Sequence, residues 1–339
     1  MNSISDLIEK YDLPIVEINP NRQYWLVRTF AGEHYEEFFH DDFIAISWNE
    51  FSDIERFKKV EKSVLVKEIE NTYPDEKRPG HIYGQMDRFI NQISVGDVVM
   101  IPSKNSTHIS FGLIDSDVYV RELSESAIDQ EVCNFKKARD VKWLKTIKRD
   151  DLDPYLYKLM QSHQTVNSAN DYSDVIDRTL HSFYIKDDTA HFVLDVRQTK
   201  DIPAMDLVTS INSLIELVPD IQDPFDQERT FKKEDVDLKL RVQSKGIIVF
   251  LASDVLVWSV LGMGILVLFI TGGKAKFSST KGKIEGELET EGLLEKILKF
   301  KKEDNSHDLK LREHEQNVKK AFEKLDAKIP DDLQGTKDE

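Results

Sequence analysis

Residues 246–271 read GIIVFLASDVLVWSVLGMGILVLFIT, and this stretch decides the predicted organisation of the chain. It contains one ionisable residue, Asp254, in 26 positions. A helix of that length reaches about 39 Å, which exceeds the bilayer hydrocarbon core of about 30 Å. The stretch therefore predicts a transmembrane helix at residues 246–272. The alternative is a fully buried helix, or a pair of buried strands, in a large domain.

Three residues of the predicted span allow more specific expectations. Asp254 is predicted either to reach the lipid headgroups or to face a neighbouring subunit. Gly262 and Gly264 permit two helices to approach closely, which predicts a homo-oligomer through this helix and, as an extension, a pore. A bend near these glycines would instead make a re-entrant segment. Basic residues are nearly balanced on the two sides of the span, so the orientation of the C-terminal part stays open.

Composition limits the functions of the remaining sequence. The chain has 339 residues and a net charge of -16, and no predicted domain is basic overall, which argues against strong nonspecific binding of duplex DNA. The single cysteine, Cys133, excludes an internal disulfide framework and a cysteine-based zinc site. No Gly-rich phosphate loop is present, and we expect no cofactor and no metal. The N-terminal residues lack an apolar signal-peptide region, so the N-terminal domains are expected in the cytoplasm.

Residues 1–170 alternate short apolar strands with short helices. Runs rich in aromatic and β-branched residues predict strands, and spaced apolar residues among charges predict helices. The predicted strands are residues 24–29, 43–48, the run after Gly96, 110–120 and 140–147, and the predicted helices are 54–73 and 84–93. Five strands in about 150 residues favour a small closed or half-closed β-barrel.

The order of these segments resembles a known family. YWLVRT (24–29), FIAISW (43–48), VGDVVMIPS (95–103), SFGLIDSDVYV (110–120) and VKWLKTIKRDDLDPYLYKLMQSHQTV (141–166) are similar to the EVE and PUA-like N-terminal domain of bacterial restriction-type, Mrr-associated proteins. The YTH fold is a relative of that group. The resemblance covers roughly residues 20–180 and implies a PUA/EVE-like barrel that holds one nucleobase, often a modified one. The implied pocket residues are Arg28, Thr29, Ser47, Trp48, Asn49, Pro102, Ser103, Ser162 and Thr165.

The residue types in that pocket suit an unstacked base. A base needs an aromatic face and hydrogen-bonding groups along its edge. Trp48 is predicted to supply the face, although a tryptophan at a strand end is also typical of a core. Arg28 is predicted either to contact a phosphate or to pair with an acid of the segment EHYEEFFHDD.

The run FKKARDVKWLKTIKR, residues 135–149, is the basic patch of this domain. Its aromatic residues Phe135 and Trp143 lie among cations, a composition expected of a nucleic-acid-binding edge. A merely solvated strand face is the alternative. The predicted contacts to a nucleic-acid backbone are Lys136, Lys137, Arg139, Lys142, Lys145 and Lys148.

Residues 171–245 predict a small α+β domain, with a hairpin at Asp187-Asp188, a helix over 203–219 and a strand near 236–242. Asp195 followed by Gln198 and Lys200 resembles the D…QxK arrangement of Mg²⁺-dependent restriction nucleases. Residues 273–339 predict a strand at KIEGELET, amphipathic helices and a disordered tail.

The fold class predicted from the sequence is α+β: a PUA/EVE-like barrel, a small α+β domain, one transmembrane helix and a short C-terminal part. The predicted function is a non-enzymatic, membrane-anchored protein of the cell inner membrane, single-pass, which binds DNA or RNA at a modified base and serves in phage defence. One alternative is a receptor for a nucleotide signal coupled to an oligomerising membrane effector. Another is a Mg²⁺-dependent nuclease.

Overall fold

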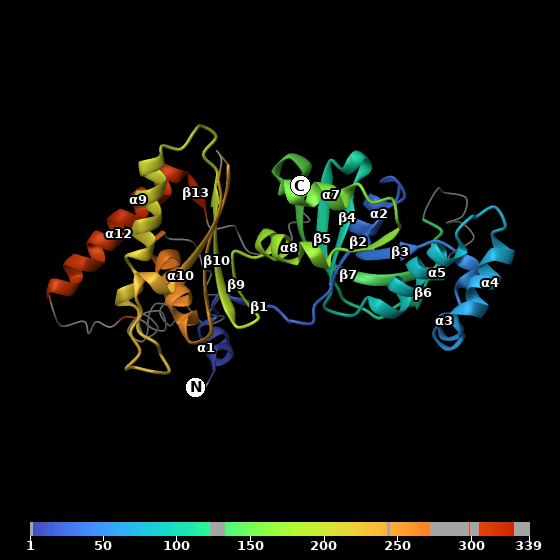
Figure 1. Ribbon diagram of the computed structural model, residues 1–339, viewed down its shortest axis with the longest axis horizontal. Coiled ribbons are helices and arrows are strands. Elements are labelled where there is room, and N and C mark those ends of the chain that lie inside the picture. Colours follow the sequence, from blue (N-terminus) through green and yellow to red (C-terminus); the bar gives the residue numbers. More distant parts are fainter. Residues whose placement is uncertain (1–2, 123–132, 243–244, 272–297, 299–304, 329–339) are drawn as a thin grey trace. The chain divides into compact units, whose positions relative to one another are not determined.

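The computed structural model describes residues 3–122, 133–242, 245–271, 298 and 305–328 (Figure 1). These residues form two compact units. The first, residues 21–180, is called the inserted unit because the chain enters and leaves it within the other unit. The second, the split unit, is formed by the described residues of 1–20 and 181–332. The chain is therefore a mixed α+β protein with a sheet in each unit.

The inserted unit contains a sheet of seven strands among its described residues. Six lie in the order β3, β7, β5, β4, β2, β8, and β6 pairs with the start of β7. The pair β2–β4 is parallel, and the other pairs are antiparallel. The strands are β2 Tyr24–Val27, β3 Phe43–Ile46, β4 Val98–Pro102, β5 His108–Ile114, β6 Tyr119–Val120, β7 Lys137–Lys148 and β8 Val166–Ser168.

A register shift between Phe111 and Gly112 disturbs the pairing of β5 with β7. A Cβ atom on Gly112 would lie 2.4 Å from Val141 Cγ1 and 2.8 Å from Trp143 Cε3, so only glycine fits there. Such irregularities bend a sheet and increase its twist. The sheet is a curled half-barrel, and this coarser form of the predicted barrel is what the structure supports.

Helices cover both faces of this sheet because its strands alternate between two cores. Trp25 and Val27 of β2 face one core, whereas Tyr24 and Leu26 face the other. This is the two-residue period of a strand with two buried faces. Helices of the first core are α2 Tyr35–His40, α3 Ile54–Lys59, α4 Lys62–Thr72 and α5 Pro79–Asp87; those of the second are α7 Tyr157–Met160 and α8 Ser173–Leu180.

The split unit places helices on one face of a second sheet, ordered β1, β9, β10, β12, β11, with β13 beside the end of β10. Side chains from the sheet and from the four α-helices among the described residues join one large core. The strands are β1 Val16–Glu17, β9 Phe183–Lys186, β10 Thr189–Val196, β11 Asp237–Val242, β12 Gly246–Ser253 and β13 Ala327–Lys328, and the helices are α1 Ile4–Tyr11, α9 Ala204–Ile215, α10 Val257–Thr271 and α12 Asn305–Leu325.

The prediction of one continuous helix over residues 246–271 is wrong for its first half. Residues Gly246–Ser253 form β12, which pairs with β10 along its whole length and with β11 on its other side. Ile248, Phe250 and Ala252 enter the large core, while Val249 joins a smaller core on the opposite face. A central strand that is buried on both faces has a nearly continuous apolar sequence, so its sequence looks like half of a membrane span.

The second half of the stretch is a helix. Asp254–Thr271 is long and apolar enough to cross a membrane, but 61% of these residues are buried inside the unit. A Cβ atom on Gly262 would lie 2.5 Å from Ile221 Cγ2, and one on Gly264 would lie 2.7 Å from Phe183 Cζ. Both glycines therefore allow α10 to pack within its own unit. The predicted division between residues 171–245 and 246–272 runs through a single sheet.

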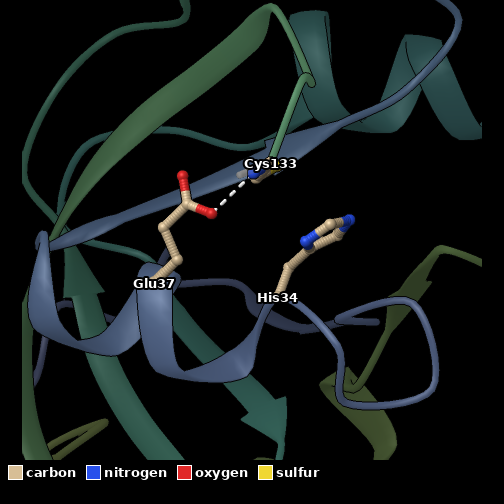
Figure 2. A group of neighbouring side chains, drawn as sticks. All are labelled: His34, Glu37 and Cys133. Atoms are coloured by element: carbon tan, nitrogen blue, oxygen red, sulfur yellow. Dashed lines mark hydrogen bonds between the residues drawn. The ribbon is translucent and has the colours of Figure 1, made fainter. Parts of the chain in front are cut away.

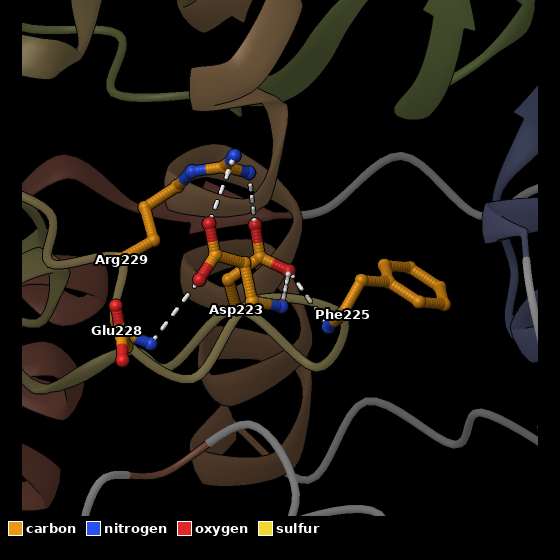
Figure 3. A network of polar contacts seen from close by, with 5 residues as sticks. Asp223, Phe225, Glu228 and Arg229 are labelled. Atoms are coloured by element: carbon orange, nitrogen blue, oxygen red, sulfur yellow. Dashed lines mark hydrogen bonds and ion pairs between the residues drawn. The ribbon is translucent and has the colours of Figure 1, made fainter.

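A polar loop packs against the start of α10 (Figure 3). The buried carboxylate of Asp223 accepts hydrogen bonds from the backbone N–H of Phe225 at 2.8 Å and of Asp226 at 3.2 Å, and it pairs with Arg229 at 2.5 Å. This network orders the loop, and the Phe225 ring lies 5.9 Å from that of Trp258 on α10. An ion-paired loop thus covers the apolar helix.

Several predictions for the C-terminal part lie outside the described residues: the strand KIEGELET, most of the amphipathic helix that follows it, and the tail. The apolar stripe expected further on is described in α12, where Val318, Phe322 and Leu325 contribute to the large core. Asp254 is exposed at the junction of β12 and α10.

Candidate functional site

The predicted pocket residues fall into two hydrogen-bonded groups, and the first surrounds Arg28. Its Nε donates to Ser162 O at 2.9 Å and its Nη2 to Met160 O at 2.5 Å, while its backbone N–H donates to Thr165 O at 2.8 Å. Burial lowers the pKa of the Arg28 guanidinium. The Arg28 side chain therefore binds carbonyl groups of the last residue of α7 and of the segment just after it, in place of the predicted phosphate or acid.

Thr29 and Ser103 also satisfy local backbone groups. Thr29 is buried, and its Oγ1 donates to Pro102 O at 2.6 Å. The Ser103 hydroxyl accepts from His108 N at 2.8 Å and closes the turn between β4 and β5. The Ser162 hydroxyl donates to Asn167 Oδ1. These groups position the loop after β2 and leave little capacity to bind a ligand.

The second group joins Trp48 and Asn49 to the segment before β7. The buried ammonium of Lys137 donates to Trp48 O at 2.6 Å. The Asn49 amide donates to Asn134 O at 2.8 Å and accepts from Lys136 N at 3.0 Å, so it holds the backbone on both sides of Phe135. Trp48 is half-buried beside the core, and Ser47 is half-buried before it.

An aromatic cluster connects the two groups. The Phe135 ring contacts His34 edge-on at 4.8 Å and Phe30 at 6.4 Å, and Phe30 stacks on His34 at 5.9 Å. Phe30 directly follows Thr29, and Phe135 is the residue that Asn49 brackets. We call Phe30, His34 and Phe135 the aromatic rim. Phe30 is 62% exposed although its ring contacts two others.

The loops of the rim hold strained backbone. Phe30, Ala31 and Trp48 have φ values of 53°, 55° and 62°, a left-handed conformation that bulky residues rarely adopt. Thr29 O accepts from both Gly32 N and His34 N, at 3.2 and 3.1 Å. Gly32 approaches Lys104 so closely that a Cβ atom would lie 2.3 Å from Lys104 Cα. Strain of this kind persists where surrounding contacts enforce it, and it concentrates at ligand sites.

The predicted backbone-binding cations do not share one role. Lys137 and Arg139 are fully buried, and Arg139 donates to Phe89 O at 2.9 Å and Ile90 O at 3.2 Å. Desolvation lowers the pKa of Lys137 to about 8 and that of Arg139 to about 10. Both hold structure, so their prediction as phosphate contacts is wrong.

The other members of the predicted set differ in exposure. Lys145 donates to Thr179 O at 2.8 Å. Lys136 is half-buried beside Phe135, and Lys142 and Lys148 are exposed on β7. Lys136, Lys142 and Lys148 thus remain candidates for contact with a nucleic-acid backbone.

Three metal-ligating side chains lie close together at the start of α2 (Figure 2), and one of them, His34, also belongs to the aromatic rim. One ligand atom each from His34, Glu37 and Cys133 lies within 4.8 Å of the others. The expectation of no metal, based on the single cysteine, does not allow for this cluster, because Cys133 lies 96 residues along the chain from Glu37. Phe30 is also absent from the predicted pocket residues, since its only signal is a ring placed directly after a strand and before the small residues Ala31 and Gly32.

A cavity of about 320 Å³ lies at α3 and α4, and none of the predicted pocket residues lines it. The residues that line this cavity include the acids Glu50, Asp53 and Glu68 and one base, Arg56, which pairs with Glu68 at 2.6 Å. Because acids outnumber bases around this cavity, it would repel the phosphates of a nucleic acid. In the split unit, Asp195 of the nuclease-like motif pairs with Arg197 at 2.9 Å, and Lys200 is exposed.

The match to a protein-family model falls on the inserted unit. Residues 25–170 match the family model described as "Domain of unknown function (DUF8426)". No curated protein matches the chain. Solved structures similar to it include the YTH domain of the Zygosaccharomyces rouxii MRB1 protein in complex with N6-methyladenosine RNA, at 11% identity and a TM-score of 0.29, covering 50% of this chain and 90% of that one.

A second similar structure is the Pho92 YTH domain in complex with m6A, at 13% identity and a TM-score of 0.27, covering 48% of this chain and 90% of that one. At these scores the likeness carries no argument about function.

Proposed function

We propose that the inserted unit is a non-enzymatic recognition module that binds an unstacked base of a single-stranded nucleic acid on the aromatic rim. The observation that supports this proposal best is the Phe30 ring, which is 62% exposed yet fixed by His34 and Phe135. In proteins that bind single-stranded nucleic acids, bases stack on exposed aromatic rings, and each stacked base contributes about 1 to 3 kcal/mol of binding free energy.

Rigidity of the rim supports binding because little side-chain freedom remains to be lost. The left-handed Phe30–Gly32 turn is enforced by Thr29 O and by Lys104, and Asn49 holds the backbone around Phe135. A preorganised surface loses less entropy on association than a mobile one. Lys136, next to Phe135, supplies a cation for a flanking phosphate.

A titration of the full-length protein with short single-stranded oligonucleotides tests the proposal. Replacing Phe30 by Ala should weaken binding by about 5- to 150-fold, the equivalent of one stacked base. Tyr155→Ala is the matched control, because Tyr155 is an exposed aromatic of the same unit and its ring contacts Tyr172 instead of the rim. Equal affinity of the Phe30 variant and the parent would refute the proposal.

Recognition of a modified base is a finer part of the proposal. Paired oligonucleotides that differ by one N6-methyl group on adenine test it, with a second pair carrying a modified cytosine. The alternative of a free nucleotide messenger predicts affinity that neither rises with oligonucleotide length nor falls with salt, in contrast to a nucleic-acid reader.

The membrane anchor, the inner-membrane location and a role in phage defence remain hypotheses from the sequence. We propose that α10 serves as the core helix of the split unit, because most of its residues are buried against the sheet and its glycines contact Ile221 and Phe183. Under this proposal, oligomer formation through Gly262 and Gly264 is not expected.

A further inference from the structure

The cluster of His34, Glu37 and Cys133 has the geometry of an incomplete metal centre. His34 precedes α2 and Glu37 lies three residues later, so both side chains project from one side of the helix start. Cys133 approaches them from the segment that leads into β7 (Figure 2). Their ligand atoms lie within 4.8 Å of one another. Ligands of a tetrahedral zinc ion are about 3.5 Å apart, so side-chain movements of about 1 Å would close the site.

The donor set selects a class of metal. One imidazole nitrogen, one carboxylate oxygen and one thiolate sulfur suit a borderline-soft ion such as Zn²⁺, whereas Ca²⁺ and Mg²⁺ prefer oxygen ligands alone. Three protein ligands leave a fourth tetrahedral position for water or another ligand.

Neighbouring groups already orient the carboxylate. The backbone N–H of Cys133 donates to Glu37 Oε2 at 2.7 Å, and Arg121 Nη2 lies 3.4 Å from Glu37 Oε1. Outer contacts of this kind orient metal ligands in known sites. They use one lone pair on each oxygen, and a carboxylate oxygen has two.

We propose that His34, Glu37 and Cys133 bind one Zn²⁺-class cation, which fastens the loop of the aromatic rim to the segment before β7. This inference shares His34 with the aromatic rim, but its test needs no nucleic acid, so it can fail while the proposed function stands, or stand while that function fails. Metal binding must displace the thiol proton of Cys133, so the affinity should rise with pH.

Co²⁺ titration of the purified, metal-stripped full-length protein tests this site. The expected result is one equivalent bound, with a thiolate-to-Co²⁺ charge-transfer band in the near ultraviolet that Zn²⁺ abolishes by displacement. Cys133→Ser should remove the band. His34→Ala should weaken binding at least 10-fold.

His40→Ala is the matched control, since His40 lies on the same helix, is exposed and pairs with Glu36. Glu37→Gln preserves shape and serves if His34→Ala fails to fold by circular dichroism; it should weaken binding likewise. Absence of a charge-transfer band in the parent protein, or unchanged affinity in every folded ligand variant, would overturn the proposal.

Discussion

The side-chain amide of Asn49 holds Phe135 from both sides, donating to the carbonyl of Asn134 at 2.8 Å and accepting from the N–H of Lys136 at 3.0 Å. One side chain thus fixes the backbone of a ring that lies 86 residues further along the chain. Because Phe135 contacts both Phe30 and His34, the position of the aromatic rim depends on Asn49.

Asn49→Ala should destabilise the protein and weaken oligonucleotide binding together. Loss of two hydrogen bonds corresponds to about 1 to 3 kcal/mol of unfolding free energy, which urea denaturation measures. Asn91→Ala is the control, because the Asn91 amide contacts only the nearby Asp87 on an exposed surface, at 2.8 Å. Unchanged binding in a folded Asn49 variant would show that the rim does not depend on this contact.

Lys137 should make stability rise with pH above about 8. Its pKa falls from 10.5 in the unfolded chain to about 8 in the folded protein, because burial disfavours the ammonium. Between these values the unfolded state binds more protons, so unfolding free energy rises by up to about 1.4 kcal/mol per pH unit. From pH 9 the thiol of Cys133, with its pKa raised to about 11, opposes this rise.

The Lys137 contribution is therefore clearest between pH 8 and 9. Urea midpoints of Lys137→Met, measured in half-unit steps, should lack the rise that the parent shows there. Lys142→Met, at an exposed position on the same strand, should retain it. If the urea midpoint of Lys137→Met still rises between pH 8 and 9, another titrating group causes the rise.

Gly264→Ala should destabilise the split unit by about 1 to 3 kcal/mol, because the added methyl would lie 2.7 Å from the Phe183 ring. Gly84→Ala, where nothing lies within 4 Å of the new Cβ, should be neutral or stabilising. Circular dichroism during thermal unfolding measures both.

The parent protein should also stay in the supernatant after high-speed centrifugation without detergent, because α10 is buried in the split unit. Recovery of the protein only in the membrane pellet would restore the hypothesis of a membrane span.

Lys136→Ala should reduce the salt dependence of oligonucleotide binding. Each phosphate contact to a single strand adds about 0.7 to the slope of log affinity against log salt, so the slope should fall by about that amount. Lys239→Ala, an exposed lysine of β11 in the split unit, should leave it unchanged. Fluorescence anisotropy at four salt concentrations gives the slope, and equal slopes would remove Lys136 from the binding surface.

Local pattern predicted most strands and helices, because the aromatic and β-branched runs at β2 and β4 face buried cores on both sides of the sheet and the run at β3 is buried in one of them. It could not predict whether residues 246–253 are helix or strand, since a strand apolar on both faces and half of a span have the same composition. The partners of Arg28, Lys137 and Arg139 also escaped prediction. Each cation binds backbone carbonyls, which residue identity does not reveal.

The pairing of β1 with β9 determines the order in which the protein assembles during synthesis. Val16 lies opposite Tyr184, and β13, near residue 328, borders β10. All strands and helices of the inserted unit lie between residues 24 and 180, so this unit has its complete sheet once that segment leaves the ribosome. The first twenty residues must wait, unpaired, for partners made much later. A nascent chain whose first 200 residues have left the ribosome would already present the aromatic rim, while the apolar faces of β9 and β10 still lacked β12 and α10.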